Sequence, residues 1–258
     1  VLQMRIIRTS LIFILLLANE VLAASSATFY GITDTLKPED EKYANALFTA
    51  AEAFKEADAL FDDEDFFARR GWSKETTTDD GDVVYGKSTP KGKMVTVSTI
   101  LDGHVDVAMN EVWTGIDVLP TWNPNINYAS ILVSMTNYTD IVTYGNADVL
   151  FVSGRDFVSS RLYRPLPTGG YRMATRSVAL AEKPEAKGKV RAHLYLGAVQ
   201  FRPDPKNPEN RTRCDVAMLV DLKGLLPKFI VNQVVPKIMS LDTEYNVKHF
   251  KELTKKTE

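Results

Sequence analysis

Cysteine is almost absent from this 258-residue chain, and because Cys214 is the only one, no disulfide can form within it. Histidine is scarce as well, since His104, His193 and His249 are far apart in the sequence. The chain also lacks the H-E-x-x-H, P-loop, G-x-S-x-G and glycine-rich dinucleotide motifs. These absences argue against the common metal, nucleotide and hydrolase sites, so we expect no catalytic residue, no metal site and no cofactor.

A strong excess of one charge is missing too. The formal net charge is −2 and the sequence pI is about 6.0, so no positive field attracts the protein to nucleic acid. Hydrophobic residues make up 45% of the chain and charged residues 25%, which is typical of an ordinary globular protein. Nucleic-acid binding is therefore not expected.

Long apolar runs are confined to the start of the sequence. Residues 1–23 contain Arg5 and Arg8, then the apolar stretch Leu11–Leu17, then small residues around Ala23. This pattern predicts a signal peptide, because a membrane-spanning helix needs about 20 apolar residues. We expect a protein that is secreted or resides in the lumen of the secretory pathway. An uncleaved signal anchor, which would leave the protein attached to a membrane, is the alternative.

The rest of the chain predicts a short tether at 24–36 and one domain at 37–258. A helical apolar pattern follows Pro38, and Asp80-Gly81 lies between two β-prone segments, as in a hairpin. Six further strand-like stretches with short connections favour antiparallel pairing, and a long helix is predicted from about 225 to 253, with a kink at Pro236. The order of elements indicates an α+β fold in which a curved sheet wraps around the last helix.

Two motifs carry a family resemblance. Arg155-Asp156-Phe157-Val158 opens one strand, and Asp221-Leu222-Lys223-Gly224, followed by Leu-Pro, precedes the last helix. In this order and spacing they resemble the START domain, a lipid-transfer module, in its sterol- and carotenoid-binding branch. The resemblance extends over about residues 40–253. It implies a helix-grip fold, in which nine antiparallel strands grip the C-terminal helix around an apolar tunnel that holds one lipid.

The same resemblance implies where the lipid lies. Arg161 matches an arginine that projects into the tunnel, although burying a charge costs several kcal/mol, by order of magnitude, unless it is paired. Asn123 and Leu119 match positions near the cavity. The expected cavity residues are Arg161, Asn123, Leu119, Tyr144 and His193, and the expected lid residues are Phe229, Ile230, Val234 and Ile238.

The sequence departs from the family around this arginine. Tyr144 or Gly145 stands where the sterol-type branch carries an acidic partner, so either Asp148 pairs with Arg161 or no acid does. His193 lies in a stretch where relatives carry an acid and a Gly-Pro, which indicates an altered cavity. The family's ligand therefore cannot simply be assigned to this chain.

The function that the resemblance implies is non-catalytic binding and transfer of one sterol-like or carotenoid-like lipid. We expect transient contact with membranes and a monomeric state. Two alternatives remain open at this point. One is an enzyme, a cyclase or a hydrolase, on a related helix-grip scaffold, and the other is a membrane-tethered START lipid sensor.

Overall fold

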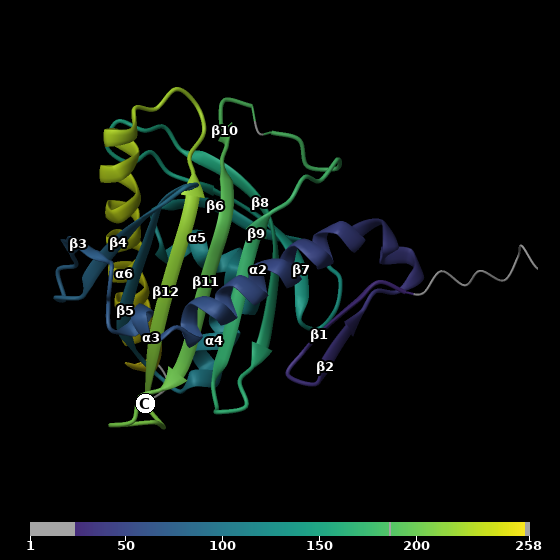
Figure 1. Cartoon of the computed structure of the whole chain (residues 1–258), viewed down its shortest axis with the longest axis horizontal. Helices are drawn as coiled ribbons and strands as arrows, with labels where there is room; N and C mark the ends of the chain where they lie inside the picture. The colour runs from purple at the N-terminus through teal and green to yellow at the C-terminus, as the bar shows by residue number, and fades with distance from the viewer. Residues whose placement is uncertain (1–23, 186, 256–258) are drawn as a thin grey trace, which may run out of the picture.

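A curved β-sheet and a long C-terminal helix dominate the computed structural model, which describes residues 24–185 and 187–255 (Figure 1). The elements in chain order are β1 (Ser26–Phe29), β2 (Ile32–Thr35), η1 (Pro38–Tyr43), α2 (Ala44–Asp62), α3 (Glu64–Phe67), β3 (Ser73–Thr77), β4 (Val83–Thr89), β5 (Gly92–Asp102), α4 (Val105–Thr114), η2 (Gly115–Val118), α5 (Leu119–Trp122), β6 (Ile126–Ser134), β7 (Thr139–Asn146), β8 (Arg155–Pro165), β9 (Tyr171–Ser177), β10 (Val190–Arg191), β11 (His193–Pro203), β12 (Arg211–Asp221) and α6 (Lys228–Lys255).

The large sheet runs in the order β3-β4-β5-β12-β11-β9-β8-β7-β6. All pairs along this path are antiparallel, and the two-residue strand β10 adds a short parallel pair to β8. Strand β12 pairs with β5, so β3, β4 and β5 join the six strands that follow them on the path through the middle of the sheet. The predicted nine-stranded antiparallel helix-grip sheet is confirmed.

The two faces of the sheet carry different helices. Neighbouring residues of β11 show the division, because Ala198 packs with the α2 cluster and Val199 packs with the α4 cluster, which also contains Phe250 of α6. This alternation is expected of a strand covered on both sides. Figure 1 shows α2 crossing one face while α6 runs along the other. The face covered by α4 and α6 contains the cavity.

Helix α2 explains why its own face of the sheet is tightly filled. Ala50, Ala53, Phe54 and Ala57 recur at helical spacing and are fully buried. Three of these four side chains are methyl groups, so the helix backbone can approach the strands closely. The predicted amphipathic helix is therefore present.

The segment predicted to be a short tether at 24–36 is instead largely a β-hairpin, β1–β2. Asp34 explains the difference, since its Oδ2 accepts hydrogen bonds from Arg164 Nη2 at 2.8 Å and from Thr139 Oγ1 at 2.7 Å. Arg164 and Asp34 are both buried, so the pair fixes the hairpin to the body of the protein. A long-range ion pair of this kind leaves no local sequence pattern.

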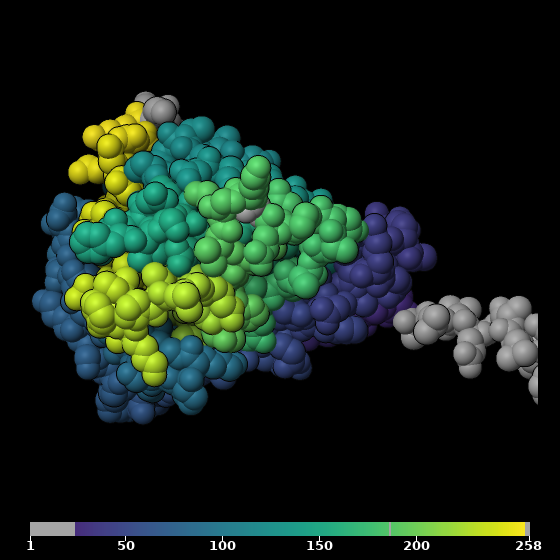
Figure 2. Space-filling view, turned by 90° about the horizontal axis from the view of Figure 1, so that it is seen from above, coloured from purple at the N-terminus to yellow at the C-terminus, as the bar shows by residue number. Residues whose placement is uncertain are grey.

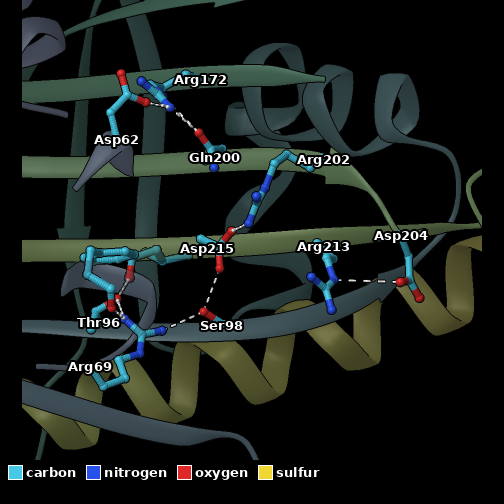
Figure 3. A network of polar contacts seen from close by, with 12 residues as sticks. Asp62, Arg69, Thr96, Ser98, Arg172, Gln200, Arg202, Asp204, Arg213 and Asp215 are labelled. Atoms are coloured by element: carbon cyan, nitrogen blue, oxygen red, sulfur yellow. Dashed lines mark hydrogen bonds and ion pairs between the residues drawn. The ribbon is translucent and has the colours of Figure 1, made fainter. Parts of the chain in front are cut away.

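Polar side chains also connect strands on the α2 face (Figure 3). Asp215 of β12 accepts hydrogen bonds from Ser98 of β5 and from Arg202 of β11. Arg172 of β9 contacts Gln200 of β11 and Asp62 at the end of α2. This network links the central strands on the face away from the cavity, so it leaves the opposite face free to be apolar.

Candidate lipid-binding cavity

A cavity of about 320 Å³ lies between the sheet and the helical layer of α4, η2, α5 and α6. Its wall is mainly apolar, with Leu101, Ile116, Leu119, Val142, Leu194 and Phe201 among its residues. A second cavity of about 120 Å³ lies towards the start of α6. Tyr144 and Asp242 line both cavities, so the two adjoin each other. A concave, mainly apolar space with a few polar groups is typical of a site for a small hydrophobic ligand.

Arg161 lies on the wall of the larger cavity and is held by Asp140 of the neighbouring strand β7. The two residues are directly opposite in the register of β7 and β8. Arg161 Nε donates to Asp140 Oδ1 at 2.9 Å and Nη2 donates to Oδ2 at 2.6 Å, which makes a two-point ion pair. The expectation that Asp148 or no acid pairs with Arg161 is therefore wrong. Asp148 instead accepts a hydrogen bond from the backbone N–H of Gly154.

The same guanidinium also caps the C-terminus of helix α4. Arg161 Nη1 donates to the carbonyl of Val112 at 3.1 Å, and Nη2 donates to the carbonyl of Trp113 at 3.0 Å. These carbonyls lie in the last turn of α4, where a helix leaves its C=O groups without intrahelical partners. A cation at this position is favourable for the helix dipole as well. Arg161 therefore has a clear structural role.

One N–H of Arg161 remains for other uses. A guanidinium has five N–H donors, and Nε, both hydrogens of Nη2 and one of Nη1 are assigned to the bonds above. Among the described residues no partner takes the second Nη1 hydrogen. Because Arg161 lines the larger cavity, this donor is available to a polar group of a ligand.

Tyr144 lies on the wall of both cavities. Its ring stacks on Phe157, with centroids 4.6 Å apart and planes 13° apart. Burial raises the pKa of the Tyr144 hydroxyl, the charge of Asp242 raises it further and that of Arg161 opposes the rise. The hydroxyl is therefore protonated at neutral pH and can donate or accept a hydrogen bond.

Asn123, Asn125 and Asp242 form this second polar group. Asn123 and Asn125 donate their side-chain N–H groups to Asp242 Oδ1, at 3.2 and 2.9 Å. Asn123 Oδ1 accepts the backbone N–H of Asn125, which fixes the corner between α5 and β6. The predicted cavity residue Asn123 lines the larger cavity, as does Leu119, the first residue of α5.

Comparison with known proteins places this architecture in a family. A model of the START domain matches residues 52–256 of the chain. The chain belongs to the START family. It is 51% identical to steroidogenic acute regulatory-like protein 1 of Caenorhabditis elegans over 89% of this chain and 88% of that protein. It is also 29% identical to the mitochondrial steroidogenic acute regulatory protein of Gallus gallus, over 77% of this chain and 69% of that one.

A solved structure supports the fold. Human StAR-related lipid transfer protein 5 superposes with a TM-score of 0.65 and 20% identity, over 79% of this chain and 99% of that one. At this identity the likeness establishes the helix-grip fold alone. The START resemblance in the sequence and the observed architecture therefore agree.

The predicted secretory localisation is wrong. The relative from Gallus gallus is named as a mitochondrial protein, as are similar proteins from Bos taurus and Homo sapiens. Targeting segments for different compartments share positive charge and apolar residues, so residues of that kind do not by themselves specify secretion. The predicted signal peptide at 1–23 lies outside the described residues. No helix within 24–185 and 187–255 is long and apolar enough to cross a membrane.

His193 does not lie where the sequence prediction placed it. It is the first residue of β11, lines neither cavity, and has its ring edge-on to Tyr195 at 4.6 Å. Leu194 lines both cavities, and because successive strand residues point to opposite faces, His193 points away. Partial burial lowers the pKa of its imidazole, which favours the neutral form.

The predicted lid residues divide into two groups. Val234 and Ile238 line the smaller cavity. Ile230 lines neither cavity but packs against the apolar cluster that contains Val234. Phe229 instead projects from the start of α6 and is 62% exposed. Pro236 lies inside α6 and is buried. The start of α6 thus covers the smaller cavity, whereas its role as a moving lid stays a prediction.

The other end of α6 is more firmly attached. His249 stacks on Trp122 of α5, with centroids 4.0 Å apart and planes 8° apart. Its Nε2 also lies 2.7 Å from Glu111 Oε1 of α4. Two helices therefore hold the C-terminal half of α6, so motion that opens the cavity is expected at the N-terminal half.

Asp242, Asn125 and Asp140 are site residues that sequence reasoning missed. Asp242 interrupts the apolar stripe of the last helix, four residues after Ile238, and this interruption is a visible signal. The pairing of Asp140 with Arg161 cannot be recognised without the register of β7 and β8, since a shift of one residue would place Asp140 on the other face of the sheet. Within the described part of the chain, no group of three or more His, Cys, Asp or Glu residues could hold a metal ion.

Proposed function

We propose that the protein binds one sterol-like lipid in the paired cavities and transfers it between membranes without changing it chemically. The observation that carries this proposal is a mainly apolar cavity whose wall holds a fixed guanidinium with one N–H that no described residue accepts. Membership of the START family and 51% identity to a steroidogenic acute regulatory-like protein support lipid binding and transfer.

The shape and polarity of the site favour a compact, mostly apolar ligand with few oxygens. Cavities of about 320 and 120 Å³ suit a fused ring system better than a long extended polyene, so we favour a sterol over a carotenoid. A sterol hydroxyl can accept the free Nη1 hydrogen of Arg161, directly or through one ordered water. The rest of the wall contributes dispersion and the hydrophobic effect rather than directional bonds.

Two exposed apolar loops offer a route to a membrane. Leu150 and Phe151 lie in the β7–β8 loop. Leu225 lies in the loop before α6, and Phe229 lies at the start of that helix. The side chains of all four residues are largely exposed. Arg155 joins the two loops by donating to the carbonyls of Leu222 and Lys223. Figure 2 shows these segments side by side on one face. Neighbouring exposed apolar side chains of this kind mark an interaction surface, and we assign it to transient membrane contact.

The test uses purified, delipidated protein and liposomes that contain phospholipid and cholesterol. After incubation and separation, native mass spectrometry measures the bound mass and organic extraction identifies the ligand. One intact cholesterol molecule per chain, later delivered to acceptor liposomes, is the expected result. A bound molecule of altered mass would instead support the enzyme alternative, and failure to bind any lipid would refute the proposal.

A further inference from the structure

Asp242 carries one carboxylate oxygen that the protein itself does not use. Its Oδ1 accepts both amide groups of Asn123 and Asn125, whereas Oδ2 has no hydrogen-bond partner among residues 24–185 and 187–255. Asp242 lines both cavities at the place where they adjoin. When the carboxyl group is ionised, its second oxygen is therefore an acceptor without a partner in the described part of the chain.

A carboxylate in this position is costly for the fold. Removing it from water raises the pKa of Asp242, and the two amide hydrogen bonds offset this only in part. Unlike Arg161, Asp242 has no ion-pair partner within the described residues. A leucine at this position would extend the apolar stripe of α6 without that cost, so the acid needs an explanation outside stability.

The two polar groups of the cavity have opposite hydrogen-bonding character. Arg161 offers a donor, because its guanidinium has no acceptor atom. Asp242 offers an acceptor, and the amides of Asn123 and Asn125 keep it in place. The charges of both groups affect the pKa of the Tyr144 hydroxyl, since Asp242 raises it and Arg161 lowers it.

We propose that Asp242, held by Asn123 and Asn125, forms a second polar subsite that selects lipids carrying a hydroxyl group at the junction of the two cavities. The hydroxyl donates to Asp242 Oδ2, where a ketone or a hydrocarbon cannot donate. This subsite rests on the proposed function, because it requires a lipid in the cavity. The selected ligand is then a sterol with an acceptor oxygen at Arg161 and a separate O–H at Asp242.

Asp242→Asn tests this with almost no change in shape. Only the amide oxygen of the new side chain can accept from Asn123 and Asn125, so its NH₂ group must take the place of Oδ2. The substitution therefore converts the acceptor in the cavity into a donor. Glu244→Gln is the matched control, because Glu244 lies on the same helix, bonds to Ser240 and lines neither cavity.

The probes are pairs of steroids that differ only in having an alcohol or a ketone at one carbon, at C3, at C17 or at the end of the side chain. Each pair competes for wild-type protein and for both variants, and native mass spectrometry measures the ratio bound. Near-ultraviolet circular dichroism confirms that each variant is folded. Cholesterol serves as the reference ligand that reports whether the cavity binds lipid at all.

Wild type and Glu244→Gln should prefer the alcohol in at least one pair by about tenfold or more, as a hydrogen bond to a charged group predicts. Asp242→Asn should abolish or reverse that preference while still binding cholesterol. An unchanged preference in a folded Asp242→Asn protein would overturn the subsite and leave lipid binding intact. If wild-type protein bound no steroid, including cholesterol, the proposed function would fail and the subsite with it.

Discussion

The ion pair between Arg161 and Asp140 makes an asymmetric prediction about stability. Its side chains are only 5% and 3% exposed, so removing either partner leaves a charge in the interior. Asp140→Asn leaves a guanidinium that cannot lose its proton, and the expected loss is about 3–5 kcal/mol of unfolding free energy. Arg161→Met leaves a carboxylate, which can become neutral by taking up a proton.

The two variants should therefore respond differently to pH. Burial already raises the pKa of Asp140, and the hydrogen bonds from Arg161 oppose that rise. Without Arg161 the pKa of Asp140 rises further above its unfolded value. The folded state then binds more protons than the unfolded state between these two pKa values, so stability increases as the pH falls through that window. The slope is at most about 1.4 kcal/mol per pH unit.

Urea unfolding of wild type, Asp140→Asn, Arg161→Met and the double variant Asp140→Leu/Arg161→Met measures these differences between about pH 5 and pH 8. The deficit of Arg161→Met relative to wild type should shrink towards low pH, whereas that of Asp140→Asn should not. The double variant should recover much of the loss, because neither charge of this pair remains in the interior. Parallel pH profiles for the two single variants would refute the reasoning.

Three further outcomes are expected. Asp242→Asn should raise the melting temperature at neutral pH. Because burial raises the pKa of Asp242, this gain should shrink as the pH falls and the wild-type carboxyl group takes up a proton. Thermal unfolding at several pH values measures the gain, and a gain that is constant with pH would exclude titration of Asp242 as its cause. Hydrogen exchange without lipid should be faster at residues 230–240 than in the central strands and should slow when cholesterol binds, whereas equal protection in both states would contradict a lid. Phe151→Ser and Phe229→Ser should slow cholesterol transfer between liposomes while Phe48→Ser, an exposed control on α2, should not; equal slowing by all three would argue against a specific membrane surface.

The regular elements could be predicted from the sequence because their signals are local. The alternation of the strands, the Asp80-Gly81 turn and the apolar stripe of α6 each lie within a short window. The cavity residues Arg161 and Asn123 came from a family resemblance rather than from periodicity. They line the cavity as expected, but their contact with a ligand stays a prediction.

What could not be predicted depends on contacts between distant segments. Asp140 meets Arg161 only once the register of two strands is fixed, and Asp34 meets Arg164 across 130 positions of chain. His193 was expected at the cavity because its stretch differs from that of the relatives, but the alternation along β11 turns Leu194 rather than His193 to the cavity. In each case the missing information is geometry between elements, which residue types alone do not contain.

The position of α6 after every strand of the sheet has a consequence for synthesis. The ribosome completes the strands that line the cavity before it completes the helix that covers them, so a growing chain exposes apolar surface that the finished protein hides. A lipid present at that stage can occupy the concave face before α6 closes over it. We therefore expect cell-free translation with cholesterol-containing liposomes to yield more soluble, lipid-loaded protein than translation with lipid added afterwards. Equal yields would show that loading occurs only through the finished fold.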